Sequence, residues 1–235
     1  VEKWGVKPES IPDWLALVQA TGTKVKVIPT DQYFPHLAQG IAVFAPNVRG
    51  SSGFGKTFVN LDNGAKRFDG VRDIAATIDF LVAEGLADPK RVGIMGGSYG
   101  GYMVMAGVTE FPDRIAAGVN LFGIVNFETF FAHSEPWMAA VSTIEYGDPA
   151  TQADLLRALS PIHKMDRIKA PVLVQHGRTD TNVPFIEAEQ VVDTLRARGV
   201  PTELVEFPDE GHGFRKTPNR IRSAVTLVEW FVKYL

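Results

Sequence analysis

Residues 96–101 read Gly-Gly-Ser-Tyr-Gly-Gly, and this segment constrains the fold more than any other part of the chain. It contains the pattern G-x-S-x-G, in which a serine occupies a sharp turn between a strand and a helix. The flanking residues fit that setting, because 91–95 form an apolar strand-like run and 98–109 are small and apolar, as in a buried helix. Gly96 and Gly100 are predicted to leave the turn the room that larger side chains would fill. An incidental serine in a glycine-rich turn is the alternative, and the flanking elements count against it.

Strand-like and helix-like segments alternate along the chain from residue 41 onward. The predicted strands are 41–45, 91–95, 115–121, 171–175 and 202–207, and the predicted helices are 67–81, 98–109, 186–198 and 220–234. This alternation predicts an α/β fold, with right-handed crossovers, a mostly parallel central sheet and helices on both faces. Ligands bind such sheets beyond the carboxyl ends of the strands, so functional residues are expected in the loops that follow strands.

Two segments depart from this alternation. Residues 122–163 carry six aromatic side chains within their first 25 positions, and we expect them to form an insertion that covers the carboxyl edge of the sheet. Near the N-terminus, 24–28 alternate polar and apolar residues as an edge strand would, and 32–39 fit a short helix. We expect 1–235 to form one domain, with 1–40 as an atypical N-terminal segment.

The composition is that of a soluble globular protein, with 45% hydrophobic and 22% charged residues among 235. A net charge of −3 provides no basic surface for nucleic acid. No signal-peptide pattern or membrane-spanning run is present, so no membrane association is expected and a cytoplasmic location is predicted.

The absence of cysteine excludes disulfides and a thiolate nucleophile. No histidine pair has metal-ligand spacing and no glycine loop completes a dinucleotide-binding pattern, so neither metal nor cofactor is expected. The sequence leaves the oligomeric state open.

A serine hydroxyl is a weak nucleophile and needs a base that a third group orients. Of the five histidines, His212 fits best, because it lies between two glycines in a loop that follows the predicted strand 202–207. The acid is expected after another strand, between the serine and the histidine in sequence, and Asp180 meets both conditions. A turn residue that bonds its own backbone is the alternative for Asp180. The order Ser98, Asp180, His212 is that of α/β-hydrolases.

Other acids and histidines fit these roles less well. His176 directly follows the predicted strand 171–175, and we expect it to be packed or bonded to backbone. Asp209 and Glu210 lie too close to His212 in sequence to approach its Nδ1 atom easily, and are expected to shape its loop.

Four motifs, in this order, resemble the catalytic domain of the prolyl oligopeptidase family of serine peptidases, especially its acylaminoacyl-peptidase and dipeptidyl-peptidase branches. They are Asn-Val-Arg-Gly-Ser-Ser-Gly-Phe-Gly at 47–55, Gly-Gly-Ser-Tyr-Gly-Gly-Tyr at 96–102, the loop of Asp180, and Asp-Glu-Gly-His-Gly-Phe at 209–214. The resemblance runs from about residue 40 to the end of the chain. It implies an α/β-hydrolase fold and an acyl-enzyme formed on short peptides or acylated amino acids. The family's propeller domain has no counterpart in this sequence.

The resemblance also implies roles around the three catalytic candidates. The backbone N–H of Tyr99 would stabilise the oxyanion, and Asn182 would hold a substrate carbonyl. The second oxyanion donor of the family belongs to a segment that is shortened or rebuilt here, where the hydroxyl of Tyr33 is the candidate. Positions that match the apolar substrate pocket, or neighbour it, are Phe127, Phe130, Val183 and Trp137. The alternative is that the two phenylalanines are core residues.

Three functional hypotheses follow. The first is a serine hydrolase that cleaves short peptides or acyl-amino-acid derivatives. The second is a carboxylesterase acting on small acyl esters, because loss of one oxyanion donor lowers rates by roughly 10²–10³ and would spare easier leaving groups. The third is a catalytically weak binding domain, or a fragment of a larger peptidase, which the altered N-terminal segment suggests and the intact catalytic residues oppose.

Overall fold

Four parallel strands form the centre of the structure, a computed structural model that describes residues 39–235. They are β1 (Gly93–Gly97), β2 (Ala117–Leu121), β3 (Val172–Gly177) and β4 (Thr202–Phe207), and they lie in that order within the sheet. All three strand pairs are parallel, so every carboxyl end points to the same edge. The predicted α/β class, with a parallel sheet, is confirmed.

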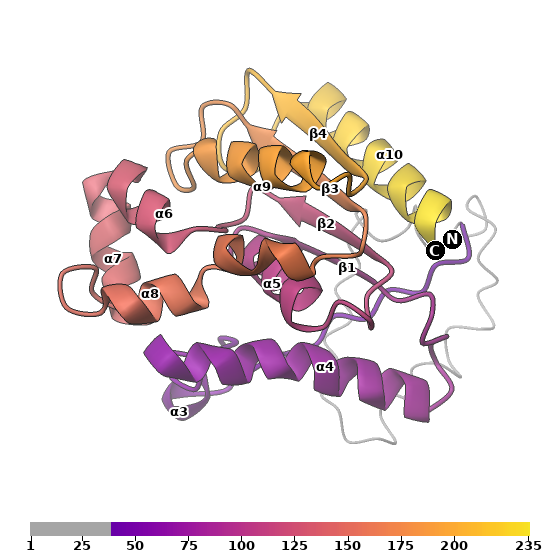
Figure 1. The fold of residues 1–235 in the computed structure, drawn as a ribbon, viewed down its shortest axis with the longest axis horizontal. Coiled ribbons are helices and arrows are strands. Elements are labelled where there is room, and N and C mark those ends of the chain that lie inside the picture. Colours follow the sequence, from indigo (N-terminus) through magenta and orange to yellow (C-terminus); the bar gives the residue numbers. More distant parts are fainter. Residues whose placement is uncertain (1–38) are drawn as a thin grey trace.

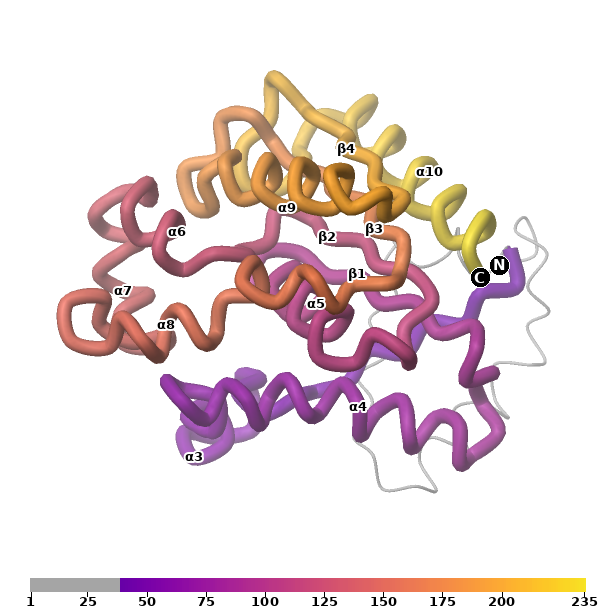
Figure 2. The backbone as a smooth tube through the Cα atoms, viewed as in Figure 1, coloured from indigo at the N-terminus to yellow at the C-terminus, as the bar shows by residue number. Residues whose placement is uncertain are grey.

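Helices cover both faces of this sheet (Figure 1). One face carries α5 (Tyr99–Glu110) and α9 (Ile186–Ala197), with α4 (Arg67–Ala83) packed against α5. The other face carries α10 (Thr217–Tyr234). Figure 2 shows the same arrangement as a trace, with α4 along the lower side of the molecule.

The alternation of side chains along each strand explains the two cores. On β2, Ala117 and Val119 face the buried Leu227, Trp230 and Phe231 of α10. On β3, Val172 and Val174 belong to the larger core, which includes α5 and α9. Nearly the whole of α5 is buried, because it lies between the sheet and other helical segments, which explains its small, apolar sequence.

The aromatic insertion forms helices at the edge of the sheet toward which the strand arrows point (Figure 1). These are α6 (Phe127–His133), α7 (Pro136–Tyr146) and α8 (Ala153–Leu159), followed by the 3₁₀ helix η3 (Pro161–Arg167). The short elements α3 (Lys56–Val59) and η2 (Gly64–Lys66) precede α4. Within the described part of the chain, no helix combines the length and the apolar character that a bilayer crossing requires.

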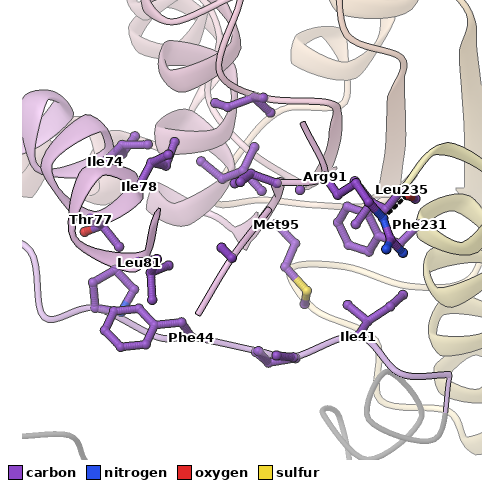
Figure 3. A pocket seen from close by; sticks show the side chains of 18 of the residues that line it. Ile41, Phe44, Ile74, Thr77, Ile78, Leu81, Arg91, Met95, Phe231 and Leu235 are labelled. Atoms are coloured by element: carbon purple, nitrogen blue, oxygen red, sulfur yellow. Dashed lines mark hydrogen bonds between the residues drawn. The ribbon is translucent and has the colours of Figure 1, made fainter. Parts of the chain in front are cut away.

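The predicted helices and four of the five predicted strands agree with the structure to within a few residues at each end. The predicted strand 41–45 is wrong, because these residues join no strand. An apolar pocket of about 540 Å³ lies between this segment and β1. Ile41, Phe44 and Met95 line it, as Figure 3 shows, and this space separates the two backbones. The predicted strand 24–28 and residues 32–38 of the predicted helix 32–39 lie outside the described residues.

A buried ion pair connects α4 to its neighbours. The Arg67 side chain is 1% exposed, and its Nη1 atom lies 3.1 Å from Asp62 Oδ2. Its guanidinium also lies over the rings of Tyr99, at 4.8 Å, and Tyr146, at 4.5 Å. A cation buried in this way must be paired to be tolerated. Arg67 therefore joins α4 to both α5 and α7.

Replacing one partner of this buried pair should destabilise the fold. Arg67→Met leaves the Asp62 carboxylate without its cation, and we expect the free energy of unfolding to fall by about 3–5 kcal/mol. Arg72→Met is the matched control on the same helix, since Arg72 is 67% exposed and pairs with Asp69 on the surface. We expect that change to stay within roughly 0.5 kcal/mol. Urea unfolding of both variants measures the difference, and equal losses would contradict the structural role of Arg67.

Two adjacent glycines of α5 should respond differently to alanine. A Cβ at Gly101 would lie 2.5 Å from Asn120 Oδ1 and from the Cα of Gly123, whereas one at Gly100 would meet no described atom within 4 Å. We expect Gly101→Ala to lower the free energy of unfolding by about 1–3 kcal/mol through overpacking. Gly100→Ala should be neutral, or stabilising by up to about 1 kcal/mol, because alanine favours helix. Denaturant unfolding compares them, and a Gly101→Ala protein as stable as Gly100→Ala would argue against the close contact.

Candidate active site

Ser98 occupies the turn between β1 and α5 with an unusual backbone. Its φ is 56° and its ψ is −119°, a combination that residues with a side chain seldom adopt. The Ser98 N–H donates to the carbonyl of Leu121 at 2.9 Å, and the Ser98 carbonyl accepts from the N–H of Tyr102 at 3.1 Å. These two bonds anchor the strained residue to β2 and to α5.

The glycines around Ser98 are not equivalent. A Cβ at Gly96 would lie 2.5 Å from the carbonyl carbon and oxygen of Gly100, so the turn closes only with glycine at 96. The predicted requirement for Gly100 itself is wrong, because a Cβ there would meet no described atom within 4 Å. Gly100 matters for its backbone, which approaches Gly96, and not for its missing side chain.

Three candidate residues meet at the carboxyl edge of the sheet. Ser98 Oγ lies 2.9 Å from His212 Nε2, and His212 Nδ1 lies 2.8 Å from Asp180 Oδ2. The three follow β1, β4 and β3, respectively, as expected for residues at the ends of parallel strands. The His212 side chain is 21% exposed, whereas that of Asp180 is fully buried.

Asp180 is held as a carboxylate. Burial opposes its ionisation, yet hydrogen bonds from His176, His212 and the Val183 N–H outweigh burial and hold the pKa of Asp180 well below its usual range. Its Oδ1 atom accepts from the N–H groups of Asn182 and Val183, each at 2.9 Å. One oxygen therefore bonds the turn, as in the alternative considered from the sequence, while the other faces His212.

The loop of His212 is braced by Glu210. The Glu210 carboxylate accepts from the N–H groups of Arg215, at 3.1 Å, and Lys216, at 2.9 Å. Its backbone carbonyl accepts from the hydroxyl of Thr179 at 2.9 Å, which ties this loop to that of Asp180. Glu210 thus shapes the loop, as expected, and its carboxylate bonds that loop's own backbone.

Phe122 is a residue of this site that sequence reasoning missed. Its φ is 42°, and its N–H donates to the carbonyl of Gln175 at 2.8 Å. The ring meets the imidazole of His212 edge-on at 4.9 Å and packs against Phe214 at 5.4 Å. The available signal was its place directly after the predicted strand 115–121. An aromatic residue there faces the same edge of the sheet as the three candidates.

Tyr99 follows Ser98 and is fixed by its side chain. The hydroxyl donates to Asp62 Oδ2 at 3.0 Å, and burial raises the pKa of Tyr99 far above its usual range. The hydroxyl therefore stays protonated and continues to donate. This anchoring fixes the position of the backbone N–H of Tyr99 at the start of α5.

The residues expected to contact substrate lie in different environments. Phe127 and Phe130 are 0% and 1% exposed and pack in the core with Tyr146, as the core alternative describes. Val183 is buried as well, whereas Trp137 on α7 is 55% exposed. Their roles toward substrate stay predictions. Tyr33 lies outside the described residues.

No group of three or more histidine, aspartate or glutamate side chains in residues 39–235 is arranged to hold a metal ion. The site as described consists of a hydroxyl, an imidazole and a carboxylate in one hydrogen-bonded series. Such a series can activate the hydroxyl as a nucleophile.

Comparison with known proteins shows that this chain is similar to part of several peptidases. Dipeptidyl aminopeptidase BIII of Pseudoxanthomonas mexicana is 39% identical over 194 residues, which are 80% of this chain and 28% of that protein. A puromycin-hydrolyzing peptidase of Mycobacterium tuberculosis aligns with a TM-score of 0.82 at 26% identity, over 91% of this chain and 32% of that one. An acylaminoacyl peptidase of Pyrococcus horikoshii aligns with a TM-score of 0.74 at 28% identity, over 80% and 31%.

This chain therefore spans about a third or less of the length of these relatives. The fold shared with them is that of the α/β-hydrolase peptidases. The profile of the prolyl oligopeptidase family matches residues 30–235, which include all three candidate catalytic residues. Since that match extends over most of the sequence, the chain belongs to the prolyl oligopeptidase family.

Proposed function

We propose that this chain is a serine peptidase domain that cleaves short peptides or acyl-amino-acid derivatives through an acyl-enzyme on Ser98. The observation that carries the proposal is the continuous contact from Asp180 to His212, at 2.8 Å, and from His212 to Ser98, at 2.9 Å. The names of the relatives, which are peptidases, support the same reaction class.

In this mechanism Ser98 Oγ attacks the substrate carbonyl carbon while His212 Nε2 takes the hydroxyl proton. Asp180 stabilises the resulting imidazolium through Nδ1 and fixes the ring orientation. Collapse of the tetrahedral intermediate breaks the scissile bond, and His212 gives its proton to the leaving amine. A water molecule, deprotonated by His212, then attacks the acyl-enzyme carbonyl, and collapse returns the proton to Ser98 and releases the acid product.

The backbone N–H of Tyr99 is the proposed oxyanion donor. N–H groups in the first turn of a helix have no acceptor within the helix, and they lie at the positive end of its dipole. The hydrogen bond from the Tyr99 hydroxyl to Asp62 supports this role, because it restrains the residue that carries the donor. The proposed second donor is the hydroxyl of Tyr33.

On the substrate side, Asn182 and Trp137 keep exposed surface and are the candidates for direct contact. Asn182 is two residues from Asp180, and its N–H bonds that carboxylate, which orients the residue at the site. The buried Phe127, Phe130 and Val183 would act by shaping the wall of the acyl pocket.

Loss of the Ser98 hydroxyl should abolish activity. We expect Ser98→Ala to lose both ester turnover and covalent labelling by a fluorophosphonate, and Asp180→Asn to lower kcat by roughly 10⁴ while keeping the fold. Ser52→Ala, which changes an exposed serine, is the control and should label fully. Labelling is followed by intact-mass spectrometry. Full labelling of Ser98→Ala would assign the nucleophile to another residue.

The leaving group separates the peptidase hypothesis from its alternatives. We expect cleavage of acyl-amino-acid and peptide anilides as well as p-nitrophenyl acyl esters, and Ser98→Ala should abolish every one of these activities. Release of p-nitroaniline and p-nitrophenol measures the two classes. Turnover of esters alone would favour the carboxylesterase. A folded protein that turns over neither class would favour the binding domain.

A further inference from the structure

A second histidine touches the acid of the proposed triad. His176 lies near the end of β3 and is completely buried. Its Nε2 atom is 2.9 Å from the carbonyl oxygen of Val183 and 3.3 Å from Asp180 Oδ2. His212 Nδ1 contacts the same Asp180 oxygen at 2.8 Å. Two imidazoles therefore share one carboxylate oxygen.

The carbonyl of Val183 determines which His176 nitrogen carries the proton. A carbonyl oxygen only accepts, so His176 Nε2 must be protonated to bond it. That N–H then faces both the Val183 carbonyl and Asp180 Oδ2. The Nδ1 atom of His176 is buried and has no hydrogen-bond partner among residues 39–235. All of the ring's polar contacts in the described chain are thus directed at the loop that carries Asp180.

Among the described residues around His176, Asp180 supplies the carboxylate that contacts the Nε2–H group. The rings of Phe122 and Phe185 flank His176 edge-on, at 6.5 Å and 5.5 Å. The guanidinium of Arg178 lies over the ring of Phe185, 4.4 Å from its centroid.

From α9, the buried Glu187 is a further charged group that acts on His176, and burial raises the pKa of Glu187. Its oxygens accept instead from the N–H groups of Val125 and Asn126 and from the Thr129 hydroxyl.

We infer that His176 is a positioning residue for Asp180, which it holds toward His212 by donating one N–H to both Asp180 Oδ2 and the Val183 carbonyl. This inference rests on the proposed catalytic role of Asp180. This N–H contacts both ends of the 180–183 turn, at the Asp180 carboxylate and the Val183 carbonyl, and so links the turn to β3. It also draws part of the negative charge of Oδ2 away from His212.

Loss of the His176 N–H should shift the pH dependence of kcat/KM in one direction. Without the His176 N–H, the Asp180 charge acts on His212 more strongly, which stabilises the protonated form of His212 that cannot serve as base. The acid limb of the kcat/KM profile should then move to higher pH. The turn should also lose restraint, so kcat should fall at every pH.

Replacement of His176 by asparagine or by glutamine, two amides of similar polarity, tests the role of its N–H group. The amide nitrogen of glutamine reaches the position of Nε2, whereas that of asparagine reaches only that of Nδ1. We expect His176→Asn to lower kcat/KM at neutral pH by roughly tenfold, the scale of a lost hydrogen bond to a charged group. Its acid limb should rise by about half a pH unit or more. His176→Gln should retain the wild-type profile. His163→Asn, at a histidine on η3, is the control and should change neither quantity.

The measurement is ester hydrolysis across pH on the full chain, with fluorophosphonate labelling of Ser98 and thermal melting for each variant. Equal profiles for His176→Asn and His176→Gln, with the wild type active, would overturn this inference alone and leave a packing role. Failure of the wild type to label at Ser98 would overturn the proposed function and this inference with it. If His176→Asn does not fold, a shifted profile in His176→Gln would also count against the inference.

Discussion

The backbone of Ser98 is the constraint on which the rest of the site depends. A residue with a side chain at φ 56° is strained, and such strain persists only where the surroundings determine it. Here the hydrogen bond to Leu121 holds the turn to β2. The missing side chain of Gly96 lets the chain double back on Gly100. The hydroxyl is thereby placed at the end of β1, where the loops that follow β3 and β4 bring Asp180 and His212.

Two polar clusters lie around this site. In the first, Arg67 and Asp62 hold Tyr99, so a buried ion pair on and before α4 restrains the residue beside Ser98. In the second, Asp180 accepts from N–H donors of its own turn and of two histidines. Charges in such positions are tolerated because they are paired and hydrogen-bonded, and their directional bonds orient the groups they touch. The first cluster therefore restrains the turn of Ser98, and the second links the loops of Asp180 and His212.

The insertion after β2 contributes side chains both to the core and to the surface. Its inner side chains, including Phe127 and Phe130, complete the core, while Trp137 on α7 remains exposed. Phe122, at the start of the insertion, contacts the imidazole of His212. The segment that distinguishes this chain from a plain parallel sheet therefore contributes both to packing and to the surroundings of His212.

The sequence by itself determined the class of fold and the order of its elements. Period-two and period-3.6 patterns are local, and the apolar runs at 91–95 and 171–175 needed no partner to be recognised. The turn at Ser98 could also be predicted, because its glycines are adjacent in sequence. So could the candidates Asp180 and His212, since parallel strands bring their carboxyl ends to one edge. The strand predicted at 41–45 is wrong because an apolar run predicts burial but does not predict which strand would pair with it.

Only the tertiary structure decided which side chains touch. Ser98 and His212 are 114 residues apart, and Arg67 lies 78 residues from the Glu145 carbonyl to which it donates. No periodicity encodes such contacts, because they depend on how loops of different length return to the same place. The contact of Phe122 with His212 is of this kind. His176 and Asp180 are only four residues apart, yet their contact depends on a turn that brings the Val183 carbonyl back to the same imidazole. The sequence named the three candidate residues, and the packing of the loops set the distances between them.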